Sequence, residues 1–442
     1  MPNYFPENNA ALASDSLERS MAKVVGGLPP ALDFMFGSFY RNFVSKKTLN
    51  HGIGPAINFT RESNATYFDA SGTLQTAGTD APRFDHSGGN SLGLLIEESR
   101  TNSLRNSQAG GAVVGAPGTL PTNWGYVGLG ALSSEVVGTG TENGLTYVDI
   151  RIFGTSNTTS VSIVFETLTQ IVASSGQTWT FSVWLKLQGG SLTNVSNVRT
   201  FIRGNTAGGT VVETLGTASV PTGSLIRYAN TGTLADALTA RVQSYINLTI
   251  TNGATVDFTL RIAAPQLERG AFPTSYIPTT SAAATRAAES AVVAPISSFY
   301  NQVESTIFSE LSATSVAFDS TILAINNNTQ NEQIDQRLAI TSVTMRARVG
   351  GVNQASMAGV SPVVAPVAGT VYKFVAAYKQ DDFAASMDGA TVVTDTSGNM
   401  PTGLSRMVIG SRTGSAFLTG HIRKLAYWPR RLSNTLLQQL TT

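Results

Sequence analysis

The sequence predicts an all-β protein with two antiparallel β-sandwich modules of the jelly-roll kind, preceded by a short N-terminal helix and a docking segment. The first observation is composition: the 442 residues include 42 Gly, and Ser, Thr and Asn supply much of the other polar share. The second is alternation of apolar and polar residues in short runs, and the third is turn residues between those runs. At roughly 150 residues per domain, this length predicts two or three domains.

Composition also excludes several classes of protein. Only 13% of the residues are charged, the net charge is +1, and no basic cluster is longer than Lys46-Lys47 or Arg430-Arg431. We therefore expect no binding to nucleic acid or to an anionic membrane surface. The absence of Cys excludes disulfides and thiolate metal sites. No apolar run approaches the ~20 residues that span a bilayer, so no membrane insertion is expected.

Residues 1–54 form the first predicted segment. Asn8 or Asn9 can cap a helix over residues 8–25, and Gly26-Gly27 followed by Pro29-Pro30 ends it. No basic start followed by an apolar core occurs in residues 1–25, so no secretory signal is expected.

An aromatic cluster follows this helix. Exposed aromatic rings are costly unless something covers them. The rings therefore either pack against the first sandwich or dock into a neighbouring protein. The residues of this cluster are Phe34, Phe36, Phe39, Tyr40 and Phe43.

Residues 55–272 are predicted to form a β region. Three runs alternate apolar and polar side chains, at residues 179–186, 246–250 and 258–262. Such alternation is typical of strands with one buried face, and several of them separated by turns predict an antiparallel sandwich.

Residues 273–295, rich in Pro, Ala, Ser and Thr, are predicted to be a linker. A second sandwich is predicted over residues 296–442. Gly350-Gly351 and Asp388-Gly389 each lie between two apolar runs, and Asp-Gly is a strong hairpin signal. A short helix from Ser433 to Leu440, capped by Ser433, closes the chain.

Several segments resemble a known family. The first set resembles a segment that recurs in tailed-bacteriophage virion proteins, where it precedes a module similar to carbohydrate-binding jelly rolls. Its parts are residues 57–69 (INFTRESNATYFD), 82–85 (PRFD) and 93–102 (GLLIEESRTN). The end of that module is similar to residues 265–270 (PQLERG) and 274–279 (TSYIPT). A last segment is similar to the end of phage concanavalin A-like or laminin G-like sandwiches, namely residues 420–433 (GHIRKLAYWPRRLS).

The resemblance implies a structural component of a phage virion, assembled in the host cytoplasm and released on lysis. It implies a tail or collar fibre or spike whose sandwiches contact host surface glycans. The expected partners are other virion proteins and further copies of the same chain, with a homotrimer as the favoured assembly. The alternatives are an architectural decoration protein of capsid, neck or tail without a glycan ligand, and a glycan-degrading depolymerase.

Catalytic signatures are weak, so we expect no enzyme. Residues 89–93 fit G-x-S-x-G, but a strand rather than a helix follows them. The histidines His51, His86 and His421 lack metal-ligand spacing, and the adjacent acids of Glu97-Glu98 point to opposite faces of a strand.

Glycan binding would use aromatic rings that stack on a sugar beside polar side chains. The candidates are Trp124, Tyr126 and Trp184, with core packing as the alternative for each, whereas Trp179 and Trp428 are expected in the cores. No cofactor is expected. Calcium is left open through Asp319 and residues 326–328, for which turn formation is the alternative.

Overall fold

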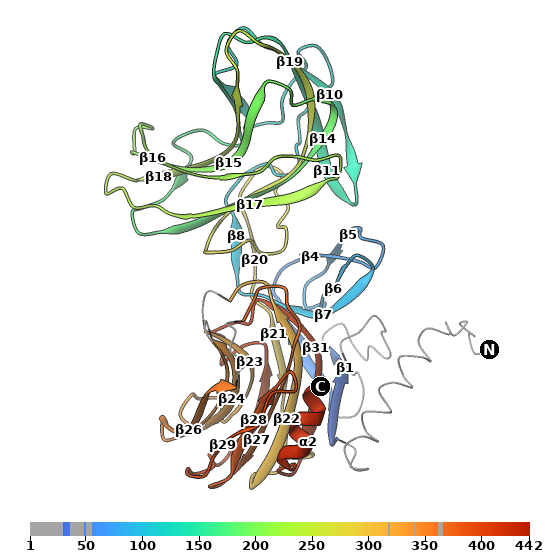
Figure 1. Cartoon of the computed structure of the whole chain (residues 1–442), viewed down its shortest axis with the longest axis vertical. Coiled ribbons are helices and arrows are strands. Elements are labelled where there is room, and N and C mark those ends of the chain that lie inside the picture. The colour runs from blue at the N-terminus through green and yellow to red at the C-terminus, as the bar shows by residue number, and fades with distance from the viewer. Residues whose placement is uncertain (1–29, 36–47, 50–54, 317–318, 340–341, 361–365) are drawn as a thin grey trace, which may run out of the picture. The chain divides into compact units, whose positions relative to one another are not determined.

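The computed structural model describes residues 30–35, 48–49, 55–316, 319–339, 342–360 and 366–442. These residues form antiparallel β-sheets and one short C-terminal helix, which confirms the all-β class (Figure 1). They divide into two compact units. The split unit comprises the described residues up to Arg61 together with Asp80–Glu98 and Glu289–Thr442, and the inserted unit comprises Glu62–Thr79 and Ser99–Ala288.

This division differs from the consecutive ranges that the sequence suggests. Residues 80–98 join the C-terminal sandwich instead of the module over 55–272, and residues 273–295 contain two short strands. The physical reason is long-range pairing: strand β3, Ile57–Thr60, lies beside β21, Ser290–Val293, in one sheet. Local alternation cannot reveal a partner strand so distant in the sequence.

The split unit is a sandwich of two eight-stranded sheets. The β22 sheet has the order β29-β28-β27-β22-β31-β7-β6, and β1 also pairs with β31. Its strands are β1 Leu32–Met35, β6 Phe84–Ser87, β7 Asn90–Ile96, β22 Glu304–Ala313, β27 Tyr372–Lys379, β28 Phe383–Met387, β29 Val393–Asp395 and β31 Gly420–Trp428. The β24 sheet has the order β2-β3-β21-β30-β23-β24-β25-β26. Its other strands are β2 Thr48–Leu49, β23 Ser320–Asn326, β24 Gln333–Ala339, β25 Ser342–Val349, β26 Val352–Val360 and β30 Arg406–Ile409.

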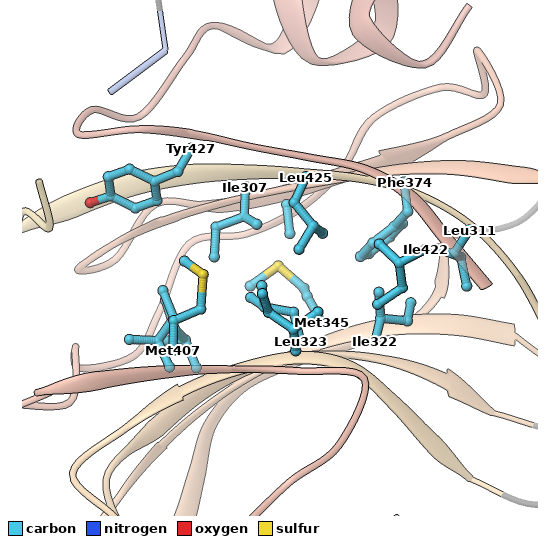
Figure 2. Packing of buried hydrophobic residues seen from close by; sticks show 14 of the residues in the cluster. Ile307, Leu311, Ile322, Leu323, Met345, Phe374, Met407, Ile422, Leu425 and Tyr427 are labelled. Carbon is cyan, nitrogen blue, oxygen red and sulfur yellow. The ribbon is translucent and has the colours of Figure 1, made fainter. Parts of the chain in front are cut away.

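The core of the split unit lies between these two sheets. Figure 2 shows Phe374 and Leu425 of the β22 sheet facing Leu323, Met345 and Met407 of the β24 sheet. All five are at most 1% exposed. Burying one such side chain stabilises a fold by roughly 1.5–3 kcal/mol, so this interface supplies much of the unit's stability.

A helix covers the other face of the β22 sheet. Helix α2, Asn434–Thr441, begins after Ser433, whose side chain accepts a hydrogen bond from the backbone of Leu436. Leu437 and Leu440 pack against Phe308, Val375 and Trp428 in a second apolar cluster, and the predicted closing helix is thereby confirmed. The β22 sheet is therefore buried on both faces where β22, β27 and β31 lie beneath this helix.

Both predicted hairpins are present in the split unit. Gly350 and Gly351 connect β25 to β26 with φ of 57° and 80°. Asp388 and Gly389, between β28 and β29, have φ of 46° and 74°. Two successive residues with positive φ match the right-handed twist of a hairpin, as the Asp-Gly signal predicts.

The inserted unit is a second sandwich. Its five-stranded sheet has the order β10-β11-β19-β14-β17: β10 Ser133–Glu142, β11 Leu145–Thr155, β14 Thr178–Ser191, β17 Ile226–Thr233 and β19 Thr255–Arg269. Its six-stranded sheet has the order β16-β15-β18-β12-β9, with β13 beside β18: β9 Gly125–Val127, β12 Ser160–Val164, β13 Ile171–Val172, β15 Val195–Asn205, β16 Val211–Ala218 and β18 Arg241–Ile250. Two small ladders complete it: β4 Ala65–Phe68 with β5 Leu74–Ala77, and β8 Arg100–Asn102 with β20 Ala284–Arg286.

The three predicted strands of this unit are confirmed within β14, β18 and β19. One detail differs, because β14 is not half-exposed. Thr180, Ser182 and Trp184, on the face that alternation marks as polar, are all buried. A small cluster that includes Tyr276 covers this second face at Trp184.

The N-terminal predictions fall mainly outside the described residues. These include the helix over 8–25 and Phe36, Phe39, Tyr40 and Phe43. Phe34 lies in β1, whose backbone pairs with β31 at Leu425. The docking role of this segment therefore stays a prediction. Among the described helices, none is long and apolar enough to span a membrane.

Candidate functional site

The candidate site is a polar pocket in the inserted unit, with a cavity volume of about 360 Å³. This size falls in the range of small-molecule sites, roughly 300–1,000 Å³. Strands β4, β5 and β20 and the segment after β19 supply most of the lining. The lining residues are Ser63, Asn64, Ala65, Thr66, Thr76, Gln108, Tyr276, Ile277, Pro278, Ala284, Thr285 and Arg286.

Buried side chains hold the 274–278 wall of this pocket in place. Gln266 Oε1 accepts from the backbone N of Ile277 at 2.7 Å, and Asn102 Nδ2 donates to the carbonyl of Ile277 at 3.0 Å. The carboxylate of Glu268 accepts from the backbone and hydroxyl of Thr274 at 2.9 and 2.7 Å. Because Asn102, Gln266 and Glu268 are fully buried, this wall is fixed before any ligand arrives.

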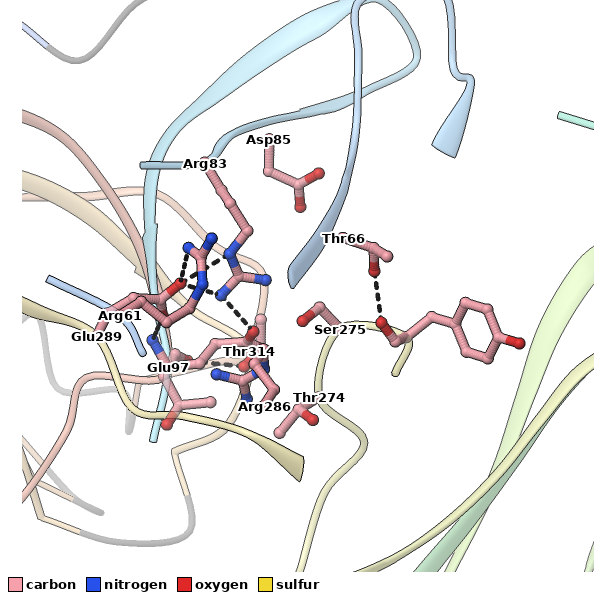
Figure 3. Close-up of polar contacts among 12 residues, drawn as sticks. Arg61, Thr66, Arg83, Asp85, Glu97, Thr274, Ser275, Arg286, Glu289 and Thr314 are labelled. Atoms are coloured by element: carbon pink, nitrogen blue, oxygen red, sulfur yellow. Dashed lines mark hydrogen bonds and ion pairs between the residues drawn. The ribbon is translucent and has the colours of Figure 1, made fainter. Parts of the chain in front are cut away.

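Tyr276 links the wall to strand β4. Its carbonyl accepts from Thr66 Oγ1 at 2.5 Å, as Figure 3 shows, and its hydroxyl pairs with Ser107 Oγ at 2.8 Å. Its ring meets Trp184 edge-on with centroids 6.0 Å apart. Burial raises the pKa of Tyr276, so its phenol stays neutral at physiological pH.

Two amide side chains in the lining are available to a ligand. Asn64 is exposed and Gln108 is half-buried, and neither side chain makes a hydrogen bond to another described residue. An amide offers both a donor and an acceptor, as a sugar hydroxyl does. With exposed Thr76 and Thr285 at the rim, the pocket suits a hydroxyl-rich ligand. These groups are suited to binding rather than to proton transfer.

Two of the predicted glycan residues lie at the core of the inserted unit. Trp124 is 8% exposed, its Nε1 donates to the carbonyl of Asn106 at 3.0 Å, and its ring meets Phe165 edge-on at 4.7 Å. Tyr126, on β9, is half-buried and packs against the same core. Burial raises the pKa of Tyr126.

The third, Trp184, lies on the opposite face of its sheet. It is 7% exposed, and the guanidinium of Arg227 lies 4.5 Å above its ring. The structure thus does not bring Trp124, Tyr126 and Trp184 around one concavity. Neither indole offers an open face to a sugar, because packing covers both. Trp179 and Trp428 are buried, as predicted.

The residues considered for calcium have protein partners. Asp319 pairs with Arg337 at 2.7 Å, and Asn328 Oδ1 accepts from Arg406 at 2.5 Å. Asn326 Oδ1 accepts from the backbone of Asn328, which makes a turn. Within the described ranges, no group of three or more His, Cys, Asp or Glu side chains could hold a metal ion.

The G-x-S-x-G residues and two of the histidines lie in different parts of the chain. Residues 89–93 lie in the β6–β7 hairpin and lead into a strand, as predicted. His421 Nε2 lies 3.1 Å from Asp85 Oδ2 in the split unit, whereas His51 lies outside the described residues.

Asn64 and Gln108 are not among the predicted site residues, because those residues were aromatic rings able to stack on a sugar. One signal was available, since Asn64 lies within the 57–69 segment on which the expected phage resemblance rests. Asn102, Gln266 and Glu268, from the quoted segments 93–102 and 265–270, build the wall instead of contacting solvent.

No family model and no curated protein matches the chain. Solved structures resemble parts of it. The CBM40 module of the Ruminococcus gnavus IT-sialidase, bound to α2,3-sialyllactose, is 15% identical, with a TM-score of 0.28 over 32% of this chain and 84% of that chain. The NanB sialidase of Streptococcus pneumoniae is 12% identical, with a TM-score of 0.29 over 34% of this chain and 26% of the sialidase chain. Domain 4 of the arabinanase AbnA of Geobacillus stearothermophilus, in complex with arabinotriose, is 10% identical, with a TM-score of 0.28 over 35% of this chain and 73% of that domain's chain. At these values the likenesses assign this chain neither a ligand nor an activity.

Proposed function

We propose that this chain is a structural protein of a bacteriophage particle, a tail or collar fibre or spike, and that its inserted unit binds glycans of the host surface. The observation that carries the binding role is the preformed pocket with the available amides of Asn64 and Gln108. The virion role is supported by the segments over 57–102 and 420–433, which resemble those of tailed-phage virion proteins.

The pocket chemistry favours a neutral sugar, because Arg286, the one charged residue of the described lining, is only 1% exposed. Its lining carries hydroxyls and amides around the apolar surface of Ile277 and Pro278, and a sugar ring presents both hydroxyls and apolar C–H groups. Because the wall over residues 274–278 is already fixed, binding carries no entropic cost for ordering this segment. Ligand contacts with the wall therefore contribute more fully to the affinity.

A glycan array with the purified full chain tests the binding role. The wild type is expected to bind a subset of neutral host-surface glycans, and the double variant Asn64→Ala/Gln108→Ala is expected to lose at least tenfold in affinity. The matched control is Gln188→Ala, because Gln188 is an exposed amide of the same unit outside the pocket. Equal binding by wild type and double variant would remove the pocket from the proposal.

Imaging of intact particles tests the virion role. The chain is expected in the tail or collar as a homotrimer, since association would cover sheet edges such as β16 and β29. A monomer in purified form and absence from the particle would contradict this role.

The alternative role is architectural, as a decoration of capsid, neck or tail. The burial of Trp124 and Trp184 favours it, because the rings expected to bind sugars stabilise the fold instead. Binding to no glycan, together with particles that fail to assemble without the chain, would favour this alternative. Release of reducing ends from host capsule would instead identify a depolymerase.

A further inference from the structure

The β24 sheet of the split unit presents an unusual outer face. On β24, Ile334 and Leu338 belong to the core, so the intervening Asp335 and Arg337 point the other way. On β25, Met345 and Ala347 belong to the core, and Arg346 and Arg348 alternate with them. Five arginines gather on this side, which we call the arginine face: Arg337, Arg346, Arg348, Arg406 and Arg412.

Strand register brings these side chains together. Asp335 pairs with Arg346, Gln333 with Arg348, and Asn326 with Arg406 across neighbouring strands. Arg412, in the turn after β30, lies within electrostatic range of Arg346, Arg337 and Arg348. All five guanidiniums are on half-buried residues.

The arginine face holds more positive charge than its carboxylates can neutralise. Arg346 binds the buried Asp335 at 2.5 Å, and Arg337 binds the exposed Asp319 at 2.7 Å. Arg348 donates to the carbonyl of Gly351 and Arg406 to Asn328, both neutral groups. Three guanidiniums, those of Arg348, Arg406 and Arg412, thus form no ion pair with a carboxylate among the described residues, although Asp335 attracts Arg412 from farther away.

Hydrogen-bonding capacity on this face is also unused. The Nε–H of each of the five arginines is buried and has no hydrogen-bond partner in the described part of the chain. The same holds for Gln333 Oε1 and Asn326 Nδ2. Buried polar atoms in native proteins are nearly always satisfied by protein groups, water or ions, so this cluster, which also includes the acceptor Asp335 Oδ1, points to a further partner such as a water or an ion.

The electrostatics agree with this geometry. Desolvation lowers the pKa of Arg412, and the neighbouring Arg346 lowers it further. Desolvation raises the pKa of Asp335 despite the attraction of Arg346. The guanidiniums therefore repel one another, and a bound anion would relieve that repulsion.

We infer that the arginine face binds a saccharide that carries an oxyanion group, either a carboxylate or a sulfate. Guanidinium groups bind such oxyanions through two parallel hydrogen bonds. The amides of Asn326 and Gln333 beside them are fully buried, so the half-buried guanidiniums are the groups that would contact the ligand. This site differs in unit and in ligand charge from the polar pocket, and it does not depend on ligand binding there.

Nucleic acid is the main competing polyanion, and the observations disfavour it. A nucleic-acid footprint is a projecting basic stripe that follows the phosphate backbone. Here the arginines are half-buried in a sheet, and the exposed carboxylate of Asp319 would face the phosphates. A short acidic saccharide can place one oxyanion on the guanidiniums and keep its neutral groups over this carboxylate.

Titration calorimetry with the full chain tests the inference. The probes are a hyaluronan tetrasaccharide for the carboxylate, a chondroitin sulfate tetrasaccharide for the sulfate, lactose as the neutral sugar, and a DNA duplex. At least one acidic oligosaccharide is expected to bind through this face, more weakly as salt rises. If the hyaluronan tetrasaccharide binds more tightly, the oxyanion is a carboxylate. If the chondroitin sulfate tetrasaccharide binds more tightly, it is a sulfate.

The variant Arg348→Gln/Arg412→Gln makes the test specific, because neither arginine forms an ion pair with a carboxylate among the described residues, although Asp335 attracts Arg412 from farther away. It is expected to lower the affinity for the acidic probe by roughly tenfold to a hundredfold, the loss expected of one charged hydrogen bond or more. The control Arg423→Gln removes a 42% exposed arginine of the same unit and is expected to have no effect. Arg348→Lys/Arg412→Lys keeps the charge and is expected to recover only part of the affinity.

A second measurement covers a variant that fails to fold. Phenylglyoxal labelling of the wild-type chain, mapped by mass spectrometry, is expected to show protection of Arg348 and Arg412 by the acidic probe, with Arg423 unprotected. Binding of neither acidic probe, unchanged affinity in a folded variant, or equal labelling with and without probe would overturn the inference. Tighter binding of the DNA duplex than of either oligosaccharide would overturn it as well.

Discussion

At the scale of single residues, Arg61, Arg83, Glu97 and Glu289 form a buried polar framework. In the split unit, Arg83 is fully buried between Glu97 at 2.7 Å and Glu289 at 2.6 Å, and Arg61 joins Glu289 at 3.2 Å (Figure 3). Burial opposes the charge of Arg83, but Glu289 and Glu97 raise its pKa overall. These charges hold segments together that lie far apart in the sequence.

Removing the central charge is expected to destabilise the protein strongly. Arg83→Met keeps most of the stem but leaves two buried carboxylates without this guanidinium, which costs about 3–5 kcal/mol of unfolding free energy. Urea denaturation followed by circular dichroism measures the loss. Arg423→Met, at an exposed ion pair with Glu310, is the control and is expected to change little. A loss no larger than the control's would contradict a stabilising role for the framework.

The sequence patterns singled out the segments that contain Arg61, Arg83 and Glu97, but they did not indicate that these side chains form buried ion pairs. The segments over 57–69, 82–85 and 93–102 were recognisable, yet Glu289 lies outside them in the range taken for a linker. Similarly, Trp124 and Trp184 carry the ring chemistry of a sugar site, but burial is decided by strands that are distant in the sequence. A single sequence does not indicate which side chains those strands cover.

At the scale of elements, prediction succeeded where the signal was local. The alternation over 258–262, the Asp388-Gly389 turn and the Ser433 cap each act within a few residues, and each element is present. The pairing of β3 with β21 and the nesting of the units were missed, because these depend on contacts across the whole chain.

Helix α2 is expected to contribute through packing rather than through its own helical propensity. A helix this short is marginal alone, so Leu437, fully buried against the β22 sheet, supplies its stability. Leu437→Ala is expected to lower the unfolding free energy by about 2–5 kcal/mol. The exposed neighbour Gln439, changed to Ala, is the matched control in the same denaturation series. Equal effects of the two substitutions would show that the contact with the sheet is not stabilising.

At the scale of the whole molecule, buried tyrosines set an alkaline limit on stability. Burial raises the pKa of Tyr300, Tyr378 and Tyr427 in the split unit. Unfolded tyrosines lose their protons near pH 10, whereas the native state retains them. The native state then binds more protons, so stability is fully present below about pH 10 and falls as the pH rises further.

An alkaline titration is expected to show tyrosinate absorbance and loss of β-structure together. Tyr300→Phe isolates one contribution, because the Tyr300 hydroxyl is buried without a hydrogen-bond partner among the described residues. This variant is expected to be at least as stable as the wild type at neutral pH and to lose less stability above pH 10. Tyrosinate absorbance that rises fully before the structure unfolds would contradict the assignment.

The short ladder of β8 with β20 has a consequence for how such chains can change. Because Arg100–Asn102 and Ala284–Arg286 pair antiparallel, the segment between them leaves and returns at neighbouring points. The entropy of closing a loop grows only as the logarithm of its length, so the segment can be lengthened or shortened at little cost to the rest. Residues 103–283 therefore have the connectivity of an exchangeable cassette, and a replacement has to keep the contacts that Thr66 and Asn102 make with Tyr276 and Ile277.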